Sequence, residues 1–177
     1  MKFEKICIAA KKACESETKE VYSNLVGELI KKGMTVSTAE SCTGGLIGKL
    51  LTDVPGSSAV FNGGIMAYVN DVKMGVLGVS KKTIDEHTEV SFECAAEMAE
   101  RTRMIFGADI GISTTGFAGP TGGNGNDPVG TVYVALASKD KCLVYRLSLG
   151  ESTSRADVRL RSAYFAVMKL TEEFLNA

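Results

Sequence analysis

The chain has 177 residues, of which 45% are hydrophobic and 23% are charged. This length suits one domain and is sufficient to bury a core without metal or disulfide cross-links. Its 20 basic and 21 acidic side chains give a net charge of −1, which argues against a dedicated binder of nucleic acid or of an anionic membrane surface.

The cysteines and the single histidine also restrict the chemistry. The five cysteines form no Cys-x-x-Cys pair, and with only His87 available a Cys/His zinc site is not expected. Scattered cysteines in odd number fit a reduced, cytoplasmic protein. The apolar run at 6–10 is shorter than a signal sequence, and a membrane helix needs roughly 20 apolar residues. We therefore expect a cytoplasmic protein without metal, cofactor, membrane or nucleic-acid partner.

The predicted elements begin with a short helix over residues 2–14. Apolar residues at helical spacing over 22–30 predict a second helix, and Gly33 lies where a terminating glycine belongs. A short strand is expected at 34–38 and a helix at 42–52. These assignments already indicate alternating helices and strands.

A β-rich stretch at 60–69 follows, and then a short helix after Ser80. Ser91 is a candidate N-cap for a helix that runs to Ile105, and 110–115 reads as a buried strand.

The C-terminal part predicts a hairpin of strands at 129–138 and 142–149, followed by an amphipathic helix over about 154–175. Strands separated by helices indicate a layered α/β domain. The hairpin favours a mixed sheet over a purely parallel one. The expected fold is therefore a single α/β domain with a mixed β-sheet flanked by helices.

Ser41 lies in the segment Thr38-Ala39-Glu40-Ser41-Cys42-Thr43-Gly44-Gly45, between a predicted strand and a predicted helix. A helix start offers free N–H groups and a positive dipole end, which can activate a nucleophile and bind an oxyanion. Two other interpretations remain open: Ser41 simply caps the helix, or Cys42 is the nucleophile instead. A Walker phosphate loop is rejected, because Thr43 replaces its first glycine and Leu50 follows Gly48-Lys49.

Lys73 lies in the segment Tyr68-Val69-Asn70-Asp71-Val72-Lys73, at the end of the β-rich stretch. Such a lysine is either an exposed surface charge or a general base. A base must be neutral, and a free lysine with a pKa near 10.4 is not. Burial would have to lower that pKa substantially.

Two further segments have both a functional and an ordinary interpretation. The glycine-rich run at 114–123 follows a strand and is either a backbone cradle for a ligand or a flexible loop. Arg155 and Arg159 are four residues apart on one helix face, where they either hold a phosphate or pair with surface carboxylates.

Together these segments resemble the CinA C-terminal domain family over about residues 20–175. The matching segments are TAESCTGG at 38–45, DVPGSS at 53–58, AYVNDVK at 67–73, LGV at 77–79, TTGFAGPTGG at 114–123 and PVGTVYVAL at 128–136. The resemblance implies an N-terminal extension at 1–17 and an amidase domain at 18–177. It also implies a homo-oligomer, most simply a dimer.

Known members of the family include stand-alone nicotinamide-nucleotide amidases. The resemblance therefore implies a metal-free Ser/Lys amidohydrolase that converts nicotinamide mononucleotide to nicotinate mononucleotide and ammonia. It implies Ser41 as nucleophile and Lys73 as base, with Tyr68 beside them. The substrate-binding positions that it implies are Thr43, Gly44, Gly45, Asn70, Thr115, Gly116, Gly119, Arg155 and Arg159. The alternative is a nucleotide-binding regulatory module that retains the pocket without catalysis.

Overall fold

A computed structural model describes residues 2–8 and 15–176 of the chain. Their elements, in order, are β1 (Glu4–Ile8), α1 (Glu15–Lys32), β2 (Val36–Glu40), α2 (Leu46–Thr52), a 3₁₀ turn (Ser57–Ala59), β3 (Phe61–Met66), α3 (Asn70–Gly75), α4 (Lys81–His87), α5 (Phe92–Ile105), β4 (Ile110–Gly116), β5 (Thr131–Ala137), β6 (Cys142–Ser148), α6 (Arg155–Leu170) and a π-helical turn (Thr171–Leu175).

The strands form one six-stranded sheet in the order β1-β6-β5-β4-β2-β3. β2 pairs in parallel with β3 and β4, and β1 pairs in parallel with β6. β5 runs antiparallel to both of its neighbours. The predicted mixed sheet and the predicted terminal hairpin are therefore confirmed.

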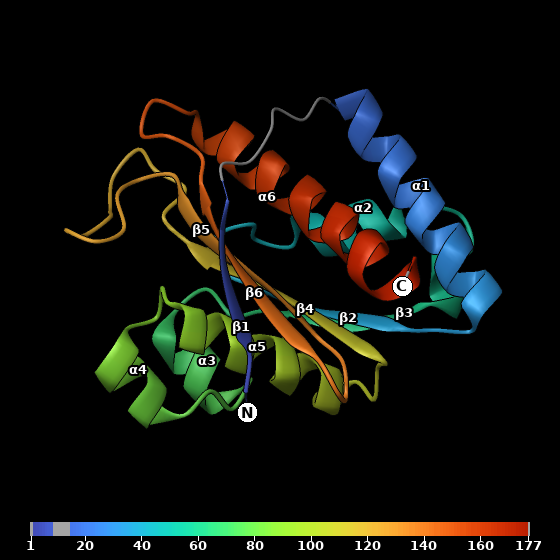
Figure 1. Ribbon diagram of the computed structural model, residues 1–177, viewed down its shortest axis with the longest axis horizontal. Coiled ribbons are helices and arrows are strands. Elements are labelled where there is room, and N and C mark those ends of the chain that lie inside the picture. The colour runs from blue at the N-terminus through green and yellow to red at the C-terminus, as the bar shows by residue number, and fades with distance from the viewer. Residues whose placement is uncertain (1, 9–14, 177) are drawn as a thin grey trace.

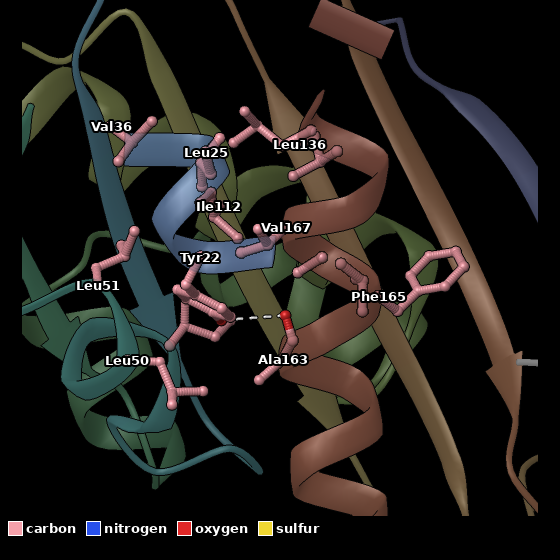
Figure 2. Packing of buried hydrophobic residues seen from close by; sticks show 14 of the residues in the cluster. Tyr22, Leu25, Val36, Leu50, Leu51, Ile112, Leu136, Ala163, Phe165 and Val167 are labelled. Atoms are coloured by element: carbon pink, nitrogen blue, oxygen red, sulfur yellow. Dashed lines mark hydrogen bonds between the residues drawn. The ribbon is translucent and has the colours of Figure 1, made fainter. Parts of the chain in front are cut away.

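Helices cover both faces of this sheet, with α1, α2 and α6 on one side and α3, α4 and α5 on the other (Figure 1). The larger apolar core lies under the first group, where the Tyr22 hydroxyl of α1 donates a hydrogen bond of 3.1 Å to the Ala163 carbonyl of α6 (Figure 2). Leu50 and Leu51 of α2 pack against the same core. The two main helices are thus fixed to each other as well as to the sheet.

Several helix boundaries follow from local chemistry. Ser91 caps α5 as predicted, with its hydroxyl accepting from the Cys94 amide, and Ser80 and Ser154 cap α4 and α6 in the same way. Gly33 and Gly107 adopt φ angles of 62° and 57° just after their helices.

The prediction of a helix at 2–14 is wrong for its described part. Residues Glu4–Ile8 form β1, which extends the sheet beyond β6, and residues 9–14 lie outside the described chain. A run of five residues cannot distinguish a helical from an extended apolar pattern. The unpaired edge of β6 supplies the hydrogen-bond partners that decide the outcome.

Two further boundaries differ from prediction. The helix expected at 42–52 begins only at Leu46, after a turn. The β-rich stretch ends at Met66, and Asn70–Gly75 form the short helix α3, which was not predicted. No described helix is long and apolar enough to cross a membrane.

Candidate active site

The parallel strands β2, β3 and β4 end at the same edge of the sheet, and the candidate site lies there. Ser41 follows β2 directly, Tyr68 lies two residues beyond β3, and Phe117 follows β4. The Ser41 amide donates to the Thr114 carbonyl at 2.9 Å and so continues the β2–β4 ladder by one step. The position of the hydroxyl is therefore fixed by the sheet.

Lys73 brings its ammonium nitrogen to 3.2 Å from the Ser41 hydroxyl oxygen. Its side chain comes from α3 and is only 1% exposed. Burial lowers the pKa of Lys73, since an apolar surrounding disfavours the charged form, although the nearby Cys94, Glu89, Cys42 and Tyr68 act in the opposite direction. The surface-charge interpretation of Lys73 is wrong, and the lowered pKa shifts this amine toward the neutral form that a general base requires.

A cavity of about 230 Å³ opens above this pair. Its lining consists of Ser41, Cys42, Tyr68, Lys73, Glu89, Val90, Thr115, Gly116, Phe117, Ala118 and Arg155. The cavity therefore joins the predicted nucleophile segment, the predicted base segment and the glycine-rich loop.

A larger hollow of about 570 Å³ lies elsewhere, along α4 and α5. It contains a serine and a lysine, but Ser80 is committed to capping α4 and Lys82 has a side chain that is 78% exposed. This hollow therefore has neither a serine hydroxyl free to react nor a buried lysine to activate it. The smaller cavity is the better candidate.

Cys42 lines the same cavity as Ser41 but is a poor rival. Its side chain is buried, and burial raises the pKa of the thiol to about 12. The thiolate is the nucleophilic form of cysteine, so at neutral pH almost all of Cys42 is unreactive. The geometry favours Ser41.

Glu40 is a buried residue beside the candidate site that the sequence analysis missed. Its carboxylate is 1% exposed and accepts hydrogen bonds from the amides of Ile47 and Gly48 and from the Thr43 hydroxyl. It therefore satisfies the first turn of α2, whose N-cap position is Gly45 with no capping side chain. The absence of Ser, Thr, Asp or Asn at that position was the available signal.

This carboxylate corrects the expectation that Ser41 lies on free N–H groups of α2. Two of those amides are taken by Glu40, and Ser41 does not cap the helix. Among the described residues, no backbone carbonyl accepts the amides of Cys42 and Ala118, which border the cavity. These two amides are candidates for an oxyanion site.

Several predicted substrate-binding residues do not line the cavity. The Thr43 hydroxyl points inward to Glu40 and Thr114, and the Thr43 carbonyl accepts two hydrogen bonds from Arg159. The Arg159 side chain thus holds the turn at residues 41–45, between β2 and α2, which we call the nucleophile turn because it contains the candidate nucleophile Ser41. Gly44, Gly45 and Asn70 lie outside the cavity lining as well.

The predicted positions on the cavity wall have defined partners. Arg155 donates to the Gly119 carbonyl at 2.8 Å and to the Tyr68 hydroxyl at 3.1 Å, so Gly119 holds this arginine through its backbone. Thr115 donates its hydroxyl to the Glu89 carbonyl at 2.6 Å. A Cβ at Gly116 would lie 2.5 Å from the Thr131 carbonyl oxygen, which explains the need for glycine there.

The chain belongs to the CinA C-terminal domain family. The family model matches residues 18–174. A relative named as a competence-damage inducible protein, from Caldanaerobacter subterraneus subsp. tengcongensis, is 49% identical over 86% of this chain and 36% of its own length. A CinA-like protein of Leptospira borgpetersenii is 51% identical over 70% of this chain and 30% of its own length. This family member thus spans about a third of the curated relatives it matches.

Solved structures agree with the assignment. The competence/damage inducible protein CihA from Agrobacterium tumefaciens has a TM-score of 0.85 and 35% identity, and the match covers 90% of this chain and 96% of that one. A CinA superfamily protein from Klebsiella pneumoniae has a TM-score of 0.86 and 31% identity, with 90% and 99% covered. The α/β fold of this CinA-type chain is that of the family.

Proposed function

We propose that this CinA-type chain is a Ser/Lys amidohydrolase that deamidates nicotinamide mononucleotide to nicotinate mononucleotide and ammonia. The observation that carries the proposal is the 3.2 Å contact between a buried lysine amine, Lys73, and the Ser41 hydroxyl at the floor of a cavity. Burial favours the neutral amine that a general base requires, because it lowers the pKa of Lys73.

In the proposed reaction, the neutral Lys73 amine accepts the Ser41 hydroxyl proton as the oxygen attacks the carboxamide carbon. The amides of Cys42 and Ala118 are suited to hold the oxyanion that forms. Lys73 then returns the proton to the leaving nitrogen, which departs as ammonia and leaves an ester on Ser41. Water, deprotonated by Lys73, hydrolyses this ester and regenerates the hydroxyl.

The cavity volume and its rim support a nucleotide substrate. At about 230 Å³, the cavity is below the range of roughly 300–1,000 Å³ that encloses a drug-sized ligand, so it suits the ring end of a nucleotide. Arg155 is exposed at the rim, and within the described part of the chain two of its five N–H donors are used, by Gly119 and Tyr68. The remaining donors are suited to a phosphate.

The deciding experiment measures ammonia release from nicotinamide mononucleotide in the presence of EDTA. We expect activity in the unaltered protein and a loss of at least about a thousandfold in Ser41→Ala and in Lys73→Met, as for other activated nucleophiles. Ser152→Ala and Lys82→Met, which change exposed residues, are matched controls expected to keep full activity. Binding of the nucleotide without ammonia release would instead support the regulatory module, and an active Ser41→Ala protein would exclude this mechanism.

A further inference from the structure

Glu89 lines the active-site cavity, and its side-chain carboxylate has no hydrogen bond or ion pair with any residue that the structure describes, although its backbone carbonyl accepts from Thr115. The neighbouring carboxylates do have cationic partners, since Glu86 lies near Lys82 and Glu93 pairs with Lys5 at 2.6 Å. Glu89 is also partly buried. Removing a charge from water without a counter-charge is costly, so a ligand that supplies the opposite charge gains the difference.

The backbone around Glu89 is held in place against an intrinsic strain. Thr88 has φ 71° and ψ 170°, a region that is populated almost only by glycine. Hydrogen bonds hold the backbone next to this residue: the Thr88 carbonyl accepts from the Ser91 hydroxyl, and the Glu89 carbonyl accepts from the Thr115 hydroxyl. Strain of this kind persists where the surrounding structure enforces it, and it commonly marks functional positions.

The charges in the cavity are few. Three lining side chains carry charge: Lys73, Glu89 and Arg155. In the proposed mechanism Lys73 is neutral before attack, which leaves one anion, Glu89, and one cation, Arg155. Two aromatic residues, Tyr68 and Phe117, line the same cavity, and aromatic ring faces attract cations.

We propose that Glu89 is a specificity residue that selects amides carried on a permanently cationic aromatic ring. The inference rests on the proposed function and deepens it. In a pyridinium substrate, the ring charge compensates the Glu89 carboxylate while Arg155 takes the anionic group. A neutral ring leaves the carboxylate desolvated without compensation, so the site discriminates against it.

Binding is the appropriate measurement, because it separates this role from catalysis. The Glu89 charge also raises the pKa of Lys73, so its removal alters turnover of every substrate. A Ser41→Ala background removes turnover and leaves the cavity charges intact. Ring selectivity can then be read directly as the ratio of two dissociation constants.

The test compares Ser41→Ala with Ser41→Ala/Glu89→Gln by calorimetric titration. The two ligands are nicotinamide mononucleotide and its neutral analogue in which a benzene ring replaces the pyridinium. We expect the Glu89→Gln change to weaken the cationic ligand about tenfold, the scale of one charge-assisted contact, and the neutral one less than about twofold. Ser41→Ala/Glu86→Gln removes an equal charge outside the cavity and should change neither.

Each other outcome overturns the inference in a recognisable way. If Glu89→Gln weakens the binding of both ligands equally, or of neither, Glu89 has no specificity role, and the amidase proposal is unaffected. Failure of the unaltered protein to release ammonia from the nucleotide removes the amidase proposal and this inference together. Glu89→Asp, which keeps the charge, should retain most of the preference for the cationic ring, and thermal melting verifies that each variant is folded.

Discussion

Arg155 and Arg159 lie one turn apart on α6, yet their guanidinium groups contact different parts of the site. Arg155 reaches the cavity wall through Gly119 and Tyr68, whereas Arg159 donates two hydrogen bonds to the Thr43 carbonyl in the nucleophile turn. The two arginines therefore do not form a single clamp: Arg155 lines the cavity, and Arg159 holds the turn between β2 and α2.

Substituting these two arginines should separate binding from stability. Arg155→Ala should raise KM by about tenfold through loss of a bidentate partner, and lower the free energy of unfolding by no more than about 1 kcal/mol. Arg159→Ala should cost about 1–3 kcal/mol in the free energy of unfolding, because it removes the charged donor from the carbonyl of Thr43, a fully buried residue. Steady-state kinetics and urea unfolding on both variants provide the comparison. The reverse pattern would assign the phosphate to Arg159.

The pH dependence of activity should report Lys73. Because burial lowers its pKa, the neutral form becomes available below the usual value near 10.4, and kcat/KM should rise with pH along one ionisation on the acid side. A flat profile between pH 6 and about 9 would contradict a lysine base.

The pH dependence of stability should follow the same group. Between the lowered pKa of folded Lys73 and the unfolded value near 10.4, the unfolded chain binds the extra proton, so the free energy of unfolding rises with pH. Below the folded pKa both states are protonated and the full burial penalty remains. Lys73→Met should lack this slope, and Lys82→Met, at an exposed position, should keep it.

Glu40 should be more important to stability than an ordinary surface carboxylate. Glu40→Gln replaces one of the two acceptor oxygens with an NH2 donor, which must then face at least one of the backbone N–H groups that the carboxylate accepts, and we expect a loss of about 1–3 kcal/mol. A drop in kcat should accompany it, since the nucleophile turn follows directly. Glu28→Gln is the matched control, because this carboxylate is on the surface and contacts only Lys31 among the residues described. Its effect should stay within about 0.5 kcal/mol.

Replacing Thr88 with glycine should stabilise the folded protein. Thr88→Gly removes the steric conflict at φ 71°, worth about 1–3 kcal/mol, and loses roughly 1 kcal/mol to chain entropy. The net expectation is no loss and up to about 2 kcal/mol of gain in urea unfolding. Thr88→Ala keeps the Cβ and removes only the hydroxyl, so it should not stabilise. A strong loss in the glycine variant would show that the hydroxyl bond to Val90 matters more than the strain.

Replacing Gly116 and Gly27 with alanine tests the effect of adding a Cβ at a crowded and at an open position. A Cβ at Gly116 would meet the Thr131 carbonyl and the Val132 Cα at 2.5 and 2.7 Å, so Gly116→Ala should cost about 1–3 kcal/mol and distort the cavity wall. Gly27, inside α1, has nothing within 4 Å of the same position. Gly27→Ala should therefore stabilise the chain by about 0.5–1 kcal/mol.

The sequence by itself indicated the elements whose signals are local. Ser91 predicted the start of α5, and Gly33 predicted the end of α1. The hairpin β5–β6 could be predicted because its strands are long and apolar. It also named Ser41 and Lys73 as candidate nucleophile and base, through the segments that they share with a known family, and the two side chains do lie 3.2 Å apart. These features depend on neighbours within a few positions, which is the range at which propensity and capping act.

The tertiary structure decided everything that depends on distant partners. β1 is a strand because the edge of β6 is open, and Lys73 is buried because the unpredicted helix α3 turns it beneath the sheet edge beside Ser41. Glu40 is a helix cap and Thr43 points inward because the turn between β2 and α2 closes on them. Burial, desolvation and register are properties of packed surfaces, and a one-dimensional pattern contains no information on which surfaces meet.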